Sequence, residues 1–307
     1  MTKKIKIISF LFIFFFVVSA FGDNLLDMIK KMNEDLLKGY TQPLITSFGT
    51  ATGCGLYHTA TPHKLLGFDI GVKAMWVTIP EAAKTFVARV LTLSPTGDKQ
   101  WVTETTATIF GEKGRDTVIA HAGYYPVIPA LPGGLDLPGF PFAMPQLSVG
   151  LIRGTEIMVR YIPIPVQGAD VQIFGAGIKI GLNKLLNLKL LPVDIAVQGV
   201  YQVFNIGDII KSSTFSANIH ASKTFLVLTP YVGLGYENTK MNFEYTFDYQ
   251  IPGQQPMQQD IKVAYTGENA FRAVAGISLK LAILLIHADY NLTKYPSFSG
   301  GLGFSLR

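Results

Sequence analysis

The chain of 307 residues has few charged side chains, a single cysteine and only one long apolar run. Charged residues make up 15% of it, whereas soluble domains usually carry about 25%. The hydrophobic share of 49% excludes an intrinsically disordered chain, and the lone Cys54 excludes an intramolecular disulfide framework. A helical membrane protein would show several apolar runs of about 20 residues. The apolar surface must therefore be hidden in another pattern.

The one long apolar run lies at the N-terminus and is typical of a secretory signal peptide. Lys3, Lys4 and Lys6 precede an apolar core over 7–18, and small residues follow it. We expect residues 1–22 to be a signal peptide, with an N-terminal membrane anchor as the alternative. Setting these three lysines aside lowers the formal net charge from +5 to +2, so we expect no nucleic-acid partner.

The next segment, residues 23–67, is expected to hold a helix and a plug. Apolar residues recur at helical spacing from Asn24 to Leu37, and Gly39 and Pro43 then predict the end of the helix. One amphipathic helix of about four turns cannot form a domain by itself. We therefore expect it to pack against the remainder of the chain.

From Phe68 onward, apolar residues alternate with polar or very small ones, which indicates strands. The runs are about ten residues long, enough for a tilted strand to cross a bilayer. Their polar faces suit a water-lined lumen better than a dry core. We predict an all-β fold, an antiparallel transmembrane β-barrel of about 12–14 strands over residues 68–307. A secreted β-sandwich is the alternative.

The expected strands can be given by residue number. They lie near 68–77, 85–93, 146–152, 155–162, 171–182, 192–204, 214–221, 225–236, 241–250, 260–267, 270–281, 283–292 and 298–306. In the hairpin around Arg153 and Gly154, alternation places Leu147, Val149, Leu151, Ile157, Val159 and Tyr161 toward lipid. Glu156 and Arg160 would face inward, where they could neutralise each other.

A proline-rich segment interrupts the strand pattern at about residues 121–145. Its six prolines exclude a helix and a central strand, and it is also rich in large apolar residues. We expect a loop that folds over the barrel mouth or lines a site for an apolar ligand. The candidate ligand-binding residues are two from the plug and four from this segment: Tyr57, His58, Tyr124, Tyr125, Phe140 and Phe142.

Two groups of side chains suggest metal or catalytic chemistry, and we expect neither. Cys54, His58 and His63 lie within ten residues, but zinc sites usually need three or four ligands at paired spacing. His220, His287, Asp289, Ser216 and Ser222 share polar strand faces, as ordinary lumen-facing residues would. A hydrolase would need spatial convergence and an oxyanion hole. We therefore predict no metal site, no catalytic residue, no cofactor and no enzymatic activity.

Two sequences carry a resemblance to a known family: PHKLLGFD at 62–69 and LPGFPFAMPQLSVG at 137–150. The chain resembles an uncharacterised family of Gram-negative outer-membrane β-barrels, a domain of unknown function, over about residues 35–307. The resemblance implies an outer-membrane location, with outer-membrane lipid and the barrel-assembly machinery as partners. More distantly, the chain is similar to long-chain fatty-acid transporter barrels. It departs from the usual barrel-assembly signal because Phe304 is followed by three further residues.

These features together predict an outer-membrane barrel that transports or binds a hydrophobic small molecule through a plugged lumen. The first alternative is a structural or interaction barrel with a filled lumen. The second, weaker alternative is an outer-membrane hydrolase.

Overall fold

The computed structural model describes most of the chain after the N-terminus. The described residues are 29–30, 32–93, 98–112, 125–126, 133–166, 169–186, 191–249, 255 and 257–306. The expected signal peptide lies outside them. None of the helices in this part of the chain is both long and apolar enough to cross a membrane.

Ten antiparallel strands form a closed barrel, which confirms the predicted fold class. In ring order they are β10 (Leu228–Tyr249), β12 (Phe271–Leu281), β13 (Leu284–Leu292), β14 (Ser297–Leu306), β1 (Phe68–Thr78), β5 (Gly139–Gly150), β6 (Thr155–Val166), β7 (Ala169–Gly181), β8 (Asp194–Ile206) and β9 (Ile210–Ser222). Pairing of β9 with β10 closes the ring. Short helical turns η2 (Ile152–Gly154) and α3 (Leu182–Leu185) join neighbouring strands.

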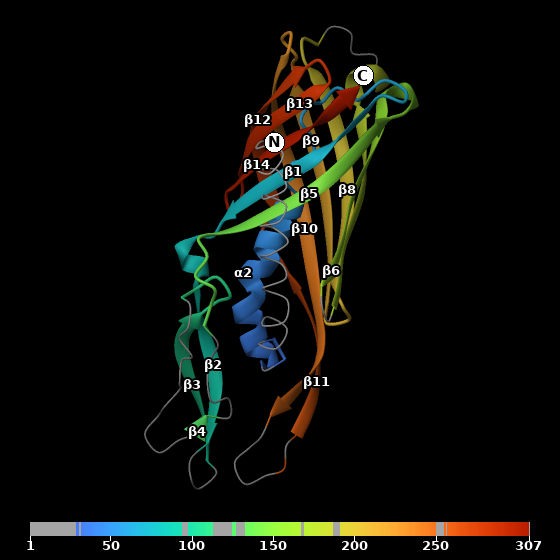
Figure 1. Cartoon of the computed structure of the whole chain (residues 1–307). Coiled ribbons are helices and arrows are strands. Elements are labelled where there is room, and N and C mark those ends of the chain that lie inside the picture. The colour runs from blue at the N-terminus through green and yellow to red at the C-terminus, as the bar shows by residue number, and fades with distance from the viewer. Residues whose placement is uncertain are drawn as a thin grey trace, which may run out of the picture.

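The remaining elements lie below the ring in Figure 1. Turn η1 (Glu81–Ala83) leads to a small sheet of β3 (Lys99–Ala107), β2 (Thr85–Leu93) and β4 (Tyr125–Pro126). Strand β11 (Met257–Thr266) pairs only with the lower half of β10. Helix α2 (Glu34–Thr52) lies between this sheet and β11 and reaches up to the ring.

The ring therefore has fewer strands than the predicted 12–14. Two predicted strands, 85–93 and 260–267, exist as β2 and β11 but lie outside the ring. Two others, 225–236 and 241–250, are parts of the single 22-residue strand β10. Alternation predicts a strand but not whether it stays within the ring, which explains the overestimate.

The two halves of strand β10 have opposite patterns of apolar and polar residues. Its outward residues are apolar and exposed in the upper half: Leu228, Val232, Leu234 and Tyr236. Below Glu237 the pattern reverses, so that the outward residues are polar and the inward ones apolar. The inward residues there are Met241, Phe243, Tyr245 and Phe247, all buried, whereas Glu244 is exposed. The upper half has the pattern of a membrane barrel and the lower half that of a water-soluble sheet.

Strand β1 changes pattern at the same level. Its inward side carries buried Asp69 and Lys73 in the ring and then Met75 and Val77 toward the lower end. Trp76 marks the last large apolar residue on the outward side, and it is half-exposed. The switch on two separate strands defines one edge of an apolar outer band.

Helix α2 differs from the predicted helix at both ends. It begins at Glu34, where the Asn33 side chain accepts a hydrogen bond from the Leu36 N–H, and it continues through Gly39 and Pro43. An internal proline costs a helix about 3 kcal/mol, which packing on several sides can offset. A Cβ at Gly39 would lie 2.1 Å from the Phe86 ring, so the glycine permits close contact with β2.

The proline-rich segment is also corrected in part. Residues 139–145 are not loop but the first half of ring strand β5, paired with β1. Strand β6 pairs with β5 over Gln146–Gly150, so within the described residues Pro141 and Pro145 have no strand partner on their other side. Prolines are tolerated in a strand where no partner needs their missing N–H.

Candidate functional site: a plugged lumen

Residues 53–67 form the plug: 53–63 run through the inside of the barrel and fill its lumen, and 64–66 are exposed where the chain leaves it. The segment from Gly53 to Ala60 is buried throughout. It follows directly from helix α2, whose C-terminus points into the ring and has no basic residue of its own in the last turn. The barrel wall therefore has to satisfy the last carbonyl groups of the helix.

Two arginines from the wall supply those hydrogen bonds. Arg160 of β6 donates to the carbonyl oxygens of Thr52, at 2.8 Å, and Cys54, at 2.9 Å. Arg272 of β12 donates to the carbonyl oxygen of Thr50 at 2.9 Å. Both guanidinium groups are buried, and they also place positive charge at the negative end of the helix.

Each arginine is itself held by the wall. Arg272 forms a buried ion pair with Glu237 of β10, and it donates to Asn291 at 2.8 Å. Arg160 donates from Nε to Gln146 Oε1 at 2.9 Å. The plug is thus tied to several strands through charge-assisted hydrogen bonds, which are the stronger class.

The Cys54 thiol lies within the same contacts. Its Sγ accepts a hydrogen bond from Arg272 Nη1 at 3.0 Å and lies 3.2 Å from Ser297 Oγ on β14. Burial raises the pKa of this thiol, because the charged thiolate is disfavoured away from water. Cys54 is therefore a packed, protonated group of the plug.

Tyr57 and His58 belong to the plug and are buried inside the lumen. The Tyr57 ring stacks on His220 with centroids 3.9 Å apart, and burial raises the pKa of its phenol. Burial holds the pKa of His58 well below its ordinary value. The Tyr57 hydroxyl and both ring nitrogens of His58 have no hydrogen-bond partner among the described residues.

The residues considered for a hydrolase form a different network. His287 Nε2 lies 2.9 Å from Lys73 Nζ, and Asp289 accepts hydrogen bonds from Tyr231 and Ser299. The hydrogen bonds of His287 thus involve a lysine and a tyrosine and not a serine nucleophile.

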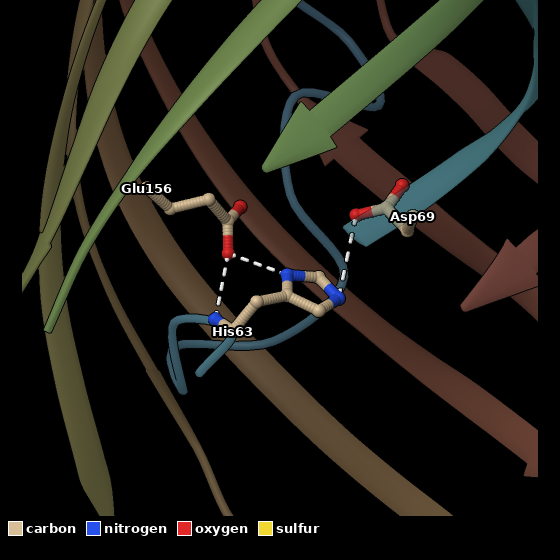
Figure 2. A group of neighbouring side chains, drawn as sticks. All are labelled: His63, Asp69 and Glu156. Atoms are coloured by element: carbon tan, nitrogen blue, oxygen red, sulfur yellow. Dashed lines mark hydrogen bonds and ion pairs between the residues drawn. The ribbon is translucent and has the colours of Figure 1, made fainter. Parts of the chain in front are cut away.

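A third cluster lies where the plug leaves the lumen and enters β1. Figure 2 shows Glu156 of β6 facing the Nδ1 side of the His63 ring and Asp69 of β1 facing the Nε2 side. Glu156 Oε1 pairs with Lys179 of β7 at 2.7 Å. The expected neutralisation of Glu156 by Arg160 is therefore wrong. Successive inward positions on one strand instead contact different parts of the plug.

The structure disperses the other predicted ligand residues. Phe142 is buried against Phe48 of helix α2, and Phe140 stacks with it, so both belong to the apolar core between β5 and helix α2. Only the backbone of Tyr125 is described, in β4, and Tyr124 lies outside the described residues. The predicted set thus does not form one site in the described part of the chain.

Two cavities adjoin the plug and the helix. One of about 220 Å³ is lined by His58 and the strand ends around Ser278, Lys280 and Ser305. The other, a groove of about 660 Å³, lies between α2, β2 and the turns at Glu268 and Tyr295. We call this second cavity the helix groove.

Sequence reasoning missed Arg160, Arg272 and Asp69 as residues that bind or face the plug. The available signal was their inward position in an alternating strand. A charged residue there is costly unless it has a partner, which the plug provides.

Comparison with known proteins identifies a family but no function. Among curated proteins there is no match. Among solved structures, the chain is similar to the transport unit of the autotransporter AIDA-I from Escherichia coli, at 8% identity and a TM-score of 0.25. That match covers 87% of this chain and 99% of the other. The distant likeness to fatty-acid transporters is not among these findings. A family model matches residues 1–306, and the chain belongs to the family of unknown function DUF6588.

Proposed function

We propose that the chain is an outer-membrane barrel that binds or transports an apolar small molecule, with residues 53–67 closing the lumen. The observation that carries this proposal is the largely polar interface between plug and wall. Hydrogen bonds such as those from Arg160 to the Cys54 carbonyl and from Gln146 to the Leu56 carbonyl can be exchanged for water as the plug shifts. An interface made only of apolar packing would not offer that exchange.

The outer surface supports a membrane location. Large apolar side chains stand exposed around the ring, among them Phe174, Phe215, Val232, Phe271 and Phe304. Exposed apolar patches of this extent mark contact with lipid or a partner. We propose outer-membrane lipid as that partner, with insertion by the barrel-assembly machinery, and we assign no reaction to the lumen.

The helix groove is the best place for the small molecule. Its apolar lining includes Pro43, Ala83 and Phe86. Its charged side chains are two lysines and two acids, of which Lys294 and Glu268 pair at 3.0 Å. Such a lining suits an apolar chain with a polar end that can both donate and accept hydrogen bonds. The groove also touches the helix that leads into the plug, so occupancy and plug position would be coupled.

A tether between plug and wall tests the proposal. Because Cys54 Sγ lies 3.2 Å from Ser297 Oγ, Ser297→Cys should allow a disulfide that holds the plug on β14. Vesicles containing this variant would be assayed with a fatty acid that carries a sulfonated dye. Uptake should stop on oxidation and return with reductant, while Ser297→Ala should behave as wild type under both conditions.

A structural barrel is the second candidate, and the buried ion pair of Arg272 with Glu237 favours it, because such a pair is costly to break. Arg160 and Arg272, on opposite sides of the barrel, both hydrogen-bond the end of helix α2. A filled scaffold would be expected to hold its plug in this way. This reading predicts that uptake equals that of empty vesicles in every redox state and that the purified barrel does not bind the probe. Those two results would reject transport.

A further inference from the structure

The cluster of His63, Asp69 and Glu156 has the composition and spacing of a metal site. All three side chains are buried, and one ligand atom from each lies within 4.8 Å of the others. They come from three places: the end of the plug, the start of β1 and the start of β6 (Figure 2).

Glu156 fixes the His63 ring. Its Oε2 accepts hydrogen bonds from the His63 backbone N–H at 3.0 Å and from the ring Nδ1 at 2.7 Å. A carboxylate that is paired with Lys179 can only accept, so Nδ1 carries the proton. Metal-binding histidines are commonly oriented in this way by a carboxylate on the other ring nitrogen. The Nε2 atom is left facing Asp69.

Asp69 is the feature that a purely structural cluster does not explain. Its side chain is 1% exposed, and neither carboxylate oxygen has a hydrogen-bond partner among the described residues. The His63 ring is the one cationic partner within 4.0 Å that this part of the chain offers it. A buried carboxylate without compensation is costly.

The distance between the two groups favours a shared ion. Asp69 Oδ2 lies 3.9 Å from His63 Nε2, which is too long for a hydrogen bond. Two ligand atoms on the same tetrahedral zinc ion, each about 2.0–2.2 Å from it, lie roughly 3.3–3.6 Å apart, so the two groups would close by a few tenths of an ångström on binding one ion. The Ser305 hydroxyl is hydrogen-bonded to Nε2 at 3.3 Å and accepts a hydrogen bond from Lys280 Nζ at 3.3 Å, so a bound ion would replace its contact with the ring.

We propose that His63 Nε2 and the Asp69 carboxylate bind a divalent metal ion of the zinc type, with Ser305 beside it and Glu156 as a positioning residue. Asp69 pairs with Ser305 across the contact of β1 with β14, where the two ends of the barrel sequence meet. The ion would therefore fasten the end of the plug to this seam. A structural metal that binds only the folded chain stabilises it by mass action.

The test is metal titration of the untagged full chain, purified in detergent and stripped with a chelator. We expect one equivalent of Zn²⁺ to bind, Co²⁺ to give visible absorption bands, and the thermal unfolding temperature to rise with added Zn²⁺. Asp69→Asn and His63→Gln should abolish binding, and Glu156→Gln should weaken it by about 10- to 100-fold.

Asp194→Asn is the matched control, since Asp194 is another carboxylate at the barrel rim that contacts the plug, through Thr61 at 2.5 Å. It should bind Zn²⁺ as wild type does. Titration of the wild-type chain tests for one bound Zn²⁺ ion even if a variant fails to fold. Absence of one-equivalent binding, or wild-type affinity in a folded Asp69→Asn, would overturn the proposal.

Discussion

Arg160 and Arg272 stand on diametrically opposite strands of the ring, five strands apart in either direction, and donate to carbonyls at the end of the same helix. Gly49 and Ala51 oxygens accept from the backbone N–H groups of Gly53 and Cys54. All four carbonyls that a helix end leaves unsatisfied are therefore paired. The two arginines centre the helix on the barrel axis and fix where the plug begins.

The two arginines should differ in their contribution to stability. Arg272→Met leaves Glu237 buried without its cation and should cost about 3–5 kcal/mol. Arg160→Met leaves only carbonyl and amide groups unpaired and should cost about 1–3 kcal/mol. Thermal unfolding in detergent measures both. The double variant Arg272→Met with Glu237→Met should recover part of the loss, and equal effects of the two single variants would contradict this assignment.

Close approach of helix and wall gives a second prediction. A Cβ at Gly49 would lie 2.3 Å from Thr239 Oγ1 on β10, so Gly49→Ala should destabilise the chain by about 1–3 kcal/mol despite the better helix propensity of alanine. Gly199→Ala on β8 is the control, since nothing lies within 4 Å of its new Cβ. A stabilised Gly49→Ala barrel would show that the helix does not pack as described.

The Cys54 thiol should be inert in the folded barrel. Its raised pKa keeps it protonated, and only the thiolate reacts readily with a maleimide. Between pH 7 and 9, labelling of unfolded chain should accelerate with pH, while labelling of folded chain should stay slow at every pH. Mass spectrometry measures the labelled fraction, with Cys54→Ser as the blank. Equal rates for folded and unfolded chain would mean that the plug leaves the lumen freely.

Most of the fold could be predicted from alternation, because a period of two fixes both the strand and its two faces. The outward positions of Leu147, Ile157 and Tyr161 are confirmed in this way. Alternation does not say which face meets lipid. Phe243 and Tyr245 follow the same rule as the ring strands, yet they face helix α2.

Less of the site could be predicted, since its contacts join residues far apart in the chain. Arg160 contacts the end of helix α2 across 108 residues and Arg272 across 222. Such pairs depend on the order and register of the strands around the ring. The local sequence pattern holds no information about either. The end of the helix was also predicted wrongly, because it too depends on distant residues. Gly39 and Pro43 would end an isolated helix, but packing against β2 and the barrel allows helix α2 to continue.

The membrane boundary on β10 is the point on which the account depends most. The direct measurement is labelling of single cysteines by a membrane-impermeant maleimide, in a Cys54→Ser background and in native membranes. Val232→Cys and Leu234→Cys should stay unlabelled because lipid covers them, whereas Glu244→Cys and Thr246→Cys should label fully. Uniform labelling along the strand would contradict a membrane-embedded ring with a water-exposed lower half.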